Sequence, residues 1–423
     1  MHWRLKSKFT WYLGLLCDMF LVPLAVLMPR NKRKIVFGAW SGRQYSCNPK
    51  YLMEYILDRG GFTCVWVGER HLRDEVLKHK GAKFATKGSL AALWHCLTAG
   101  VYACNVQWRT DIAWIPWCRR VKLLYLTHGS PDKKTGVLQL DGRGHLASAS
   151  SGRRKGCIRG FLGGLISGFW NFCYDESAWC SATSPIGEEI RLANMPFRLS
   201  KERMLHCGTP RFDFMIHHAK DDNLRRKLRE KYAHILGLPE DKRWILYVPT
   251  WRHNSEDVFS FTNAVQVKRL QEQLEMDNFI LIEKHHPIIL ERGMVKGGQA
   301  GGIFVISREQ SLHIDMQELL LASDRLITDY SSIYYDFYLM DRPVIHYIYD
   351  YDRFMNVDMG FNFDIREYGG GPFAGTEEEL LRYLAMTDGA LLACRNEKTR
   401  EHLTYETGHS CEGYYKLLER LAE

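Results

Sequence analysis

The sequence predicts an α/β protein made of two doubly wound, Rossmann-type domains that face each other across a cleft. The chain of 423 residues is too long for one ordinary hydrophobic core. Short apolar runs alternate with longer amphipathic stretches, as in a parallel sheet covered by helices on both faces. This rhythm occurs twice, before and after a charged helix expected at 218–236. We therefore expect an N-terminal domain at 31–215, a C-terminal domain at 216–405 and a final helix at 406–423.

The N-terminal domain is expected to open with a strand at 34–38, because KIVFG is a short apolar run that ends at a glycine. Helical periodicity then alternates with runs of strand-forming residues as far as Gly208. The further strands are expected at 62–68, 101–105, 121–126, 179–183 and 203–208, and the helices at 48–60, 71–81, 89–100 and 184–194.

The C-terminal domain is expected to repeat this rhythm after the charged helix, which Gly237 ends. A later helix begins at Thr376, whose pairing with Glu379 predicts a capping box. The strands are expected at 244–252, 279–287, 302–307, 325–329 and 342–349, and the other helices at 264–276, at 315–322 and from Ser331 onward.

Two segments depart from the alternating pattern. Residues 137–172 are first basic and then apolar and glycine-rich, so they form either a functional loop or a surface excursion with one packed helix. Residues 11–28 are almost wholly apolar between basic flanks, and we expect 1–30 to lie as a helix in the cytoplasmic membrane interface. The protein would then be peripheral to the cytoplasmic face, whereas a buried first helix is the alternative. A spanning helix is disfavoured because Asp18 and Pro23 interrupt the run.

Composition narrows the classes of partner. A net charge of +8 is compatible with an anionic ligand or a membrane surface. The twelve cysteines contain no C-x-x-C pair, which disfavours a zinc site and a disulfide framework. No carboxylate cluster indicates a metal site, and there is neither a P-loop nor a G-x-G-x-x-G motif. The basic residues are not interleaved with aromatic ones into a stacking platform, so nucleic acid is not expected.

The first candidate site follows the strand at 121–126. Ligands of open α/β sheets bind beyond the carboxyl ends of the strands, so residues that directly follow a strand are candidates. Here His128 and Gly129 end the strand, and Lys133 and Lys134 follow. An imidazole at this position can take a proton from a hydroxyl near neutral pH, and Gly129 lets the backbone approach a ligand. The alternative is a structural histidine.

The second candidate site is the run IEKHHP at 282–287. Lys284 and His286 alternate with His285, so they are expected to point to the same side of an extended chain. An ammonium and an imidazole together suit a phosphate. Pro287 ends the strand and is included in the predicted site. A solvated basic loop is the alternative.

The third candidate site is the turn in LITDYSSIYYDF, residues 326–337. Ser331 or Ser332 is expected to cap a helix whose free N–H groups and dipole attract an anion. Asp336, about one turn later, is placed to accept a polyol hydroxyl or to hold a helix end. An ordinary N-cap without a ligand is the alternative. The predicted site at this turn comprises Thr328, Asp329, Tyr330, Ser331, Ser332 and Asp336.

Two further arginines are expected near the same cleft. Arg252 closes the run VPTWR, which also contains Thr250, and offers a forked donor for phosphate. Arg211 lies in the turn GTPRFDF near the domain junction. For both arginines the alternative is a structural ion pair.

The motifs LTHGSPDKKTG, GTPRFDF, YVPTWR, KHHP, LITDYSSIYYDF and RPVIHYIYDYDRF resemble, in this order, those of CDP-glycerol glycerophosphotransferases. That family includes the primases and polymerases of wall teichoic acid and related capsule enzymes, and the resemblance covers about residues 35–420. It implies a GT-B-like fold and a CDP-glycerol or CDP-ribitol donor. No further cofactor is expected, because the basic groups of the site can carry the charge of the phosphate. It also implies that His128 is the base, that His286 is a second essential histidine, and that Ser331 and Ser332 lie at the donor diphosphate.

The resulting hypothesis is transfer of a polyol phosphate from the CDP-polyol to a hydroxyl of a lipid-linked or glycan acceptor, with release of CMP. The chain departs from the family pattern where Asp132 precedes Lys133. Two other functions remain open: a GT-B glycosyltransferase that uses a nucleotide sugar, and a non-catalytic membrane-bound binding protein. Glycerol or ribitol as the polyol, one or many added units, and a homo-oligomeric state also remain open.

Overall fold

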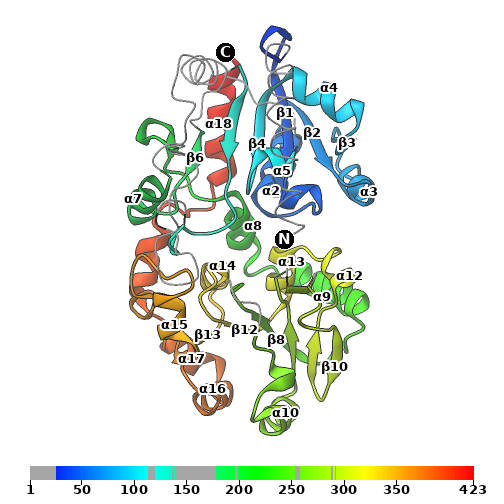
Figure 1. Ribbon diagram of the computed structural model, residues 1–423. Coiled ribbons are helices and arrows are strands. Elements are labelled where there is room, and N and C mark those ends of the chain that lie inside the picture. The colour runs from blue at the N-terminus through cyan, green and yellow to red at the C-terminus, as the bar shows by residue number, and fades with distance from the viewer. Residues whose placement is uncertain are drawn as a thin grey trace, which may run out of the picture.

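The computed structural model describes residues 25–112, 120–135, 138, 178–195, 199–252, 258–286, 289–290 and 292–423. These residues form two large, mainly parallel β-sheets, one in each half of the chain. Each sheet separates two hydrophobic cores, so helices cover both of its faces. In Figure 1 the N-terminal half lies above the C-terminal half. The predicted α/β class with parallel sheets is confirmed.

The first sheet has the order β3-β2-β1-β4-β5, and all its strands are parallel. In β1, Val36 packs into one core while Ile35 and Phe37 pack into the other. This explains a continuous apolar run, since both faces of the strand are covered. The elements of this half are β1 (Asn31–Gly38), α2 (Cys47–Arg59), β2 (Thr63–Gly68), α3 (Arg73–Val76), β3 (Lys83–Thr86), α4 (Leu90–Thr98), β4 (Ala99–Cys104), α5 (Trp108–Asp111), β5 (Lys122–Tyr125), β6 (Cys180–Ser181), α7 (Pro185–Asn194), β7 (Met204–Leu205) and α8 (Pro210–His218).

The second sheet has the order β10-β11-β9-β8-β12-β13-β14, with only the β10–β11 pair antiparallel. Its central strand β8 lies between β9 and β12. The elements of this half are α9 (Asp222–Leu236), β8 (Arg243–Val248), α10 (Val267–Met276), β9 (Phe279–Glu283), β10 (Gly298–Ala300), β11 (Ile303–Val305), α12 (Arg308–Ser311), α13 (Met316–Ala322), β12 (Arg325–Thr328), α14 (Ile333–Leu339), β13 (Val344–Tyr347), α15 (Tyr351–Asn356), β14 (Phe373–Ala374), α16 (Glu377–Leu384) and α17 (Asp388–Ala393).

The last helix, α18 (Ser410–Ala422), returns to the N-terminal half. Figure 1 shows it in red beside the blue and cyan elements. Tyr414, Leu417 and Leu418 are buried in the same core as Ile35 of β1. The chain therefore crosses twice between the halves, once before α9 and once before α18.

Several predicted elements are shorter than expected. The helix expected at 71–81 is reduced to a 3₁₀ turn and the four residues of α3. The strands expected at 179–183 and 203–208 contribute only two residues each, paired as β6 and β7. At α16 the Thr376 side chain accepts from the Glu379 N–H, but the Glu379 carboxylate accepts from Gly375. Only half of the predicted capping box is therefore made.

The expected N-terminal membrane helix falls mostly outside the described residues, which begin at Ala25. Ala25 is fully buried in the core that also contains Val36 of β1. Arg30 donates hydrogen bonds to the carbonyls of Ala25 and Cys96. The end of this segment is therefore packed into the fold beside α4. No helix among the described residues has both the length and the apolar character needed to cross a membrane.

Buried polar contacts join the two halves. Lys50 of α2 pairs with Asp315 at 3.0 Å and with Glu318 of α13 at 2.9 Å. The Asn362 side chain donates to carbonyls of the loop that follows His128, including that of Asp132 at 3.2 Å. These contacts hold the carboxyl ends of the two sheets toward each other.

Candidate functional site

A cavity of about 490 Å³ lies between the carboxyl ends of the two sheets. The N-terminal half contributes the loop after β5 and one face of α7, and the C-terminal half contributes the loops after β8, β9 and β12. Its polar and charged lining includes Gln44, Thr127, His128, Ser130, Asp132, Lys133, Thr135, Arg191, Asn194, Arg211, Thr250, Lys284, His285, His286, Gln317, Ser331, Ser332 and Asp336.

The loop that carries His128 has an unusual backbone. Thr127 has φ +54°, a left-handed conformation that costs energy for a β-branched residue. The Asn48 side chain holds it in place by donating to the carbonyls of Leu126 and Thr127 at 2.8 and 2.9 Å. A Cβ atom at Gly129 would lie only 2.8 Å from Oγ of Ser332, so the glycine permits the approach of the two halves. His128 and the Ser332 turn are thus neighbours across the cavity.

The His128 ring is fixed by its neighbours while its open side faces the cavity. Its centroid lies 5.1 Å from the Trp40 ring, and Nδ1 lies 3.4 Å from the carbonyl oxygen of Asn105. An Nδ1–H that donates to this carbonyl leaves Nε2 as the proton acceptor. Although the side chain is exposed to the cavity, the surrounding protein desolvates it and lowers the pKa of His128 to about 4. The ring is therefore neutral near pH 7.

The loop after β9 supplies two basic groups to the opposite wall. Burial lowers the pKa of Lys284 to about 8. It also lowers the pKa of His286 to about 4, with Lys284 and His128 adding to the shift. The Lys284 ammonium has no hydrogen bond or ion pair to any described residue, so it is available to an anion. Between these two side chains, His285 is buried and pairs with Glu283 at 2.8 Å.

Lys133 crosses the cavity from the N-terminal half. Its ammonium donates to Oγ1 of Thr250 at 3.1 Å, just beyond β8. Burial lowers the pKa of Lys133 to about 8, although Asp329 acts in the opposite direction. The hydroxyls of Ser331 and Ser332 also line the cavity and make no hydrogen bond to another described residue. The predicted residues His128, Lys133, Lys284, His286, Ser331 and Ser332 are thus brought together.

The structure corrects the expected position of Arg252. Arg252 is 3% exposed, and its guanidinium pairs with both carboxylate oxygens of Asp350 and with Asp329 and donates to the Thr250 carbonyl. Its donor groups are engaged, so the fork does not point at a ligand. Arg252 is a structural ion pair behind the cavity wall.

The expectation for Asp336 is also corrected. Its carboxylate is fully buried and receives two hydrogen bonds of 3.0 Å from Arg211 and a third from Gln317, so it holds the Arg211 side chain instead of facing a polyol hydroxyl. Arg211 in turn donates to the carbonyl of His128 at 2.7 Å. This pair joins α8 to α14 and fixes the His128 loop.

Three other predicted residues lie behind the cavity wall. Thr328 donates to the carbonyl of Val248, Asp329 accepts from the Thr250 N–H at 2.7 Å, and Tyr330 is buried against Phe354. They fix the turn before α14 from behind. Pro287 lies outside the described residues.

Sequence reasoning missed three residues around the site. Asn105 and Trp40 follow β4 and β1, so the same rule that selected His128 applies to them. Arg191 lies within α7, where no local signal distinguishes it from a solvated helical arginine. It is 8% exposed and donates to the carbonyl of Gly129 at 3.0 Å.

Comparison with known proteins places this geometry in a family. The profile of CDP-Glycerol:Poly(glycerophosphate) glycerophosphotransferase matches residues 20–419. The chain belongs to this family. It is 28% identical over 410 residues to the teichoic acid poly(glycerol phosphate) polymerase of Bacillus spizizenii, covering 95% of this chain and 94% of the relative. It is 27% identical over 361 residues to the teichoic acid glycerol-phosphate transferase of Staphylococcus aureus, covering 85% of each.

Solved structures show a shared fold. A variant of the wall teichoic acid polymerase TagF matches with a TM-score of 0.70 and 21% identity, over 99% of this chain and 98% of that chain. The resemblance found in the motifs is confirmed, and the chain is an enzyme of the glycerophosphotransferase family.

Proposed function

We propose that this chain transfers glycerol phosphate from CDP-glycerol to a hydroxyl of a teichoic acid acceptor and releases CMP. The observation that carries the proposal is the cavity in which a neutral imidazole of one half faces an unpaired ammonium of the other. The named donor of the family and the named products of its relatives support the same substrate class.

In the proposed reaction His128 acts as the general base. Its Nε2 takes the proton of the acceptor hydroxyl, while Nδ1–H remains directed at the Asn105 carbonyl. The acceptor oxygen forms a bond to the β-phosphorus of CDP-glycerol, and the bond from that phosphorus to the oxygen of CMP breaks. A pKa well below 7 keeps the ring in the basic form before the substrate binds.

The second wall stabilises the negative charge. Lys284 and Lys133 lie where the diphosphate would approach, and the Ser331 and Ser332 hydroxyls face the same space. Catalysis of phosphoryl transfer depends chiefly on positioning and electrostatics, which these groups supply. The scheme uses no metal ion or further cofactor, and CDP-glycerol enters as a substrate.

The acceptor is proposed to be lipid-linked, with the protein peripheral to the cytoplasmic face of the membrane. The apolar character of residues 11–28 supports this location. So does α4, beside Ala25, where Leu90 and Trp94 are 83% and 58% exposed. Aromatic and aliphatic side chains of this kind favour the membrane interface.

Measurement of the released nucleotide tests the proposal. With CDP-glycerol, CDP-ribitol and a set of nucleotide sugars offered alongside lipid-linked acceptors, CMP is the expected product and CDP-glycerol the preferred donor. Release of a nucleoside diphosphate from a nucleotide sugar would instead indicate a glycosyltransferase. Binding of CDP-glycerol without any release would indicate a non-catalytic protein.

A further inference from the structure

Arg191 differs from the other buried arginines of the described chain. Its Nη2 donates to the Gly129 carbonyl at 3.0 Å and to Oγ1 of Thr127 at 3.2 Å, but its buried Nε has no partner. It forms no ion pair with any described carboxylate. The other strongly buried guanidiniums are compensated by carboxylates or by carbonyls at a helix end, as in Arg211, Arg252, Arg325 and Arg342.

A buried cation without a counter-charge is costly, so its retention points to an anionic ligand. Asp132 is near enough to interact with Arg191 electrostatically, yet it makes no ion pair with it. Burial raises the pKa of Asp132 to about 7, so this carboxyl is only partly charged near neutrality. Arg191 therefore retains a positive charge that the described residues balance only in part.

The position of Arg191 separates it from Lys284. It lies on α7 in the N-terminal half, beside Asn194 and Met195, whereas Lys284 comes from the C-terminal half. Asn194 is 1% exposed, and its Oδ1 also has no partner. The His128 loop lies between α7 and the turn before α14, because Arg191 donates to the Gly129 carbonyl and Gly129 lies against Ser332.

We propose that Arg191 binds the phosphodiester that precedes the attacking glycerol of the acceptor, and so selects acceptors that already end in glycerol phosphate. This inference rests on the proposed function. A hydroxyl at His128 Nε2 belongs to a glycerol whose other end carries that phosphodiester, on the α7 side of the base. Each transfer produces a new terminal glycerol joined to a phosphodiester, so the product can occupy the same site again. The assignment therefore favours repeated extension over a single addition.

Two acceptors that differ only in one terminal glycerol phosphate unit test the inference through CMP release. We expect the wild type to show a KM about 10- to 100-fold lower for the acceptor with the phosphodiester, the range of a charge-assisted hydrogen bond. Arg191→Gln should remove this preference, and Arg191→Lys, which keeps the charge, should retain part of it. Arg342→Gln, the same change at a buried guanidinium outside the cavity, should preserve the full preference.

A purely structural role gives a different result. If Arg191 only held the His128 loop, Arg191→Gln would lower kcat with both acceptors by the same factor and leave the ratio of their KM values unchanged. That outcome, or a wild type without the preference, would overturn the assignment while the proposed function stands. CMP release with neither acceptor would instead overturn the proposed function, and the assignment with it.

Discussion

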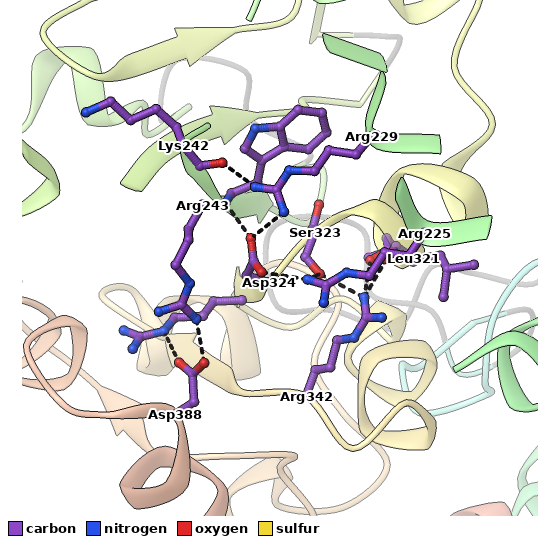
Figure 2. A network of polar contacts seen from close by, with 12 residues as sticks. Arg225, Arg229, Lys242, Arg243, Leu321, Ser323, Asp324, Arg342 and Asp388 are labelled. Atoms are coloured by element: carbon purple, nitrogen blue, oxygen red, sulfur yellow. Dashed lines mark hydrogen bonds and ion pairs between the residues drawn. The ribbon is translucent and has the colours of Figure 1, made fainter. Parts of the chain in front are cut away.

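The two edges of the second sheet differ in whether their buried positive charges have a compensating partner. At the amino ends of β8 and β12, Arg225 and Arg229 both pair with Asp324, and Arg243 pairs with Asp388 (Figure 2). Arg342 donates to the carbonyls of Leu321 and Ser323 where α13 ends (Figure 2). Carbonyls at a helix C-terminus carry partial negative charge, so this guanidinium is also compensated.

At the carboxyl edge of the same sheet, Lys284 after β9 and Lys133, which reaches Thr250 after β8, lack such compensation. Lys284 has no ionic partner among the described residues, and Lys133 donates only to the neutral hydroxyl of Thr250. Burial lowers the pKa of both to about 8. Arg252 is the exception, since Asp329 and Asp350 balance it. The contrast teaches that pairing, rather than position at a strand end, distinguishes a structural cation from one available to a ligand.

Among changes at the cavity beside the carboxyl edge of the second sheet, removal of the proposed base should have the largest effect on kcat. His128→Ala should lower kcat for CMP release by about 10²- to 10⁴-fold, the usual contribution of general base catalysis, while CDP-glycerol still binds. His234→Ala, on the exposed side of α9, serves as the matched control and should not change kcat. Near-wild-type turnover by His128→Ala would show that the ring is not the base.

Lys284→Met should have opposite effects on binding and on stability. Loss of the ammonium removes a charge-assisted contact with the diphosphate, so KM for CDP-glycerol should rise about 10- to 100-fold. Because the same change removes an uncompensated, partly buried charge, the melting temperature should rise. Calorimetry and steady-state kinetics measure the two effects. A lower melting temperature would contradict the view that this lysine is unbalanced in the free protein.

The pH dependence of donor binding sharpens the same contrast. As pH rises through about 8, Lys133 and Lys284 lose their protons, so the affinity for CDP-glycerol should fall. Their folded pKa lies below the ordinary value of 10.5, so the unfolded chain binds more protons between these values and stability should rise with pH over this window. Titration calorimetry and denaturant unfolding from pH 7 to 10.5 test both trends. A binding constant that stays flat in this range would exclude the lysines as the titrating groups.

Loss of an ion pair at the amino ends of β8 and β12 should lower stability without changing kcat. Asp324→Ala leaves Arg225 and Arg229 without their shared carboxylate and removes the acceptor for the backbone N–H of Trp244. The expected cost is about 3 kcal/mol of the free energy of unfolding, at the lower end for a broken buried pair because the arginines are partly exposed. Urea unfolding measures it, and kcat of the folded protein should be unchanged. A fall in kcat without a fall in stability would reverse the roles assigned to the two ends.

The sequence predicted the alternation of elements well because both faces of each sheet are covered, which makes its strands continuous apolar runs. The strand-end rule found His128, Lys284 and Ser332, since parallel strands bring their carboxyl ends to one edge. The rule does not indicate which charges are neutralised by distant residues. Arg252 is balanced by Asp350, 98 positions later in the chain, and only the tertiary structure brings the two together.

Arg191 shows the reverse limit. Its helix α7 was predicted, yet a guanidinium on a helix is usually solvated, and only packing against the loop at Gly129 reveals it as buried. The short elements α3, β6 and β7 were overestimated for a similar reason. Local propensity predicts the type of an element better than its length, which packing decides.

Removal of residues 1–24 should have the smallest effect on turnover. These residues are distant in sequence from both edges of the second sheet. The deletion should move the protein from the membrane to the soluble fraction and leave kcat with a detergent-dispersed acceptor unchanged. The deletion must end before Ala25, because Ala25 is buried in the same core as Val36 of β1 and its carbonyl accepts a hydrogen bond from Arg30. Flotation with anionic vesicles measures the partition, and the double change Leu90→Ser and Trp94→Ser tests whether α4 adds to it. Unchanged flotation after the deletion would assign membrane association to other parts of the chain, and a loss of kcat would show that the segment supports the fold.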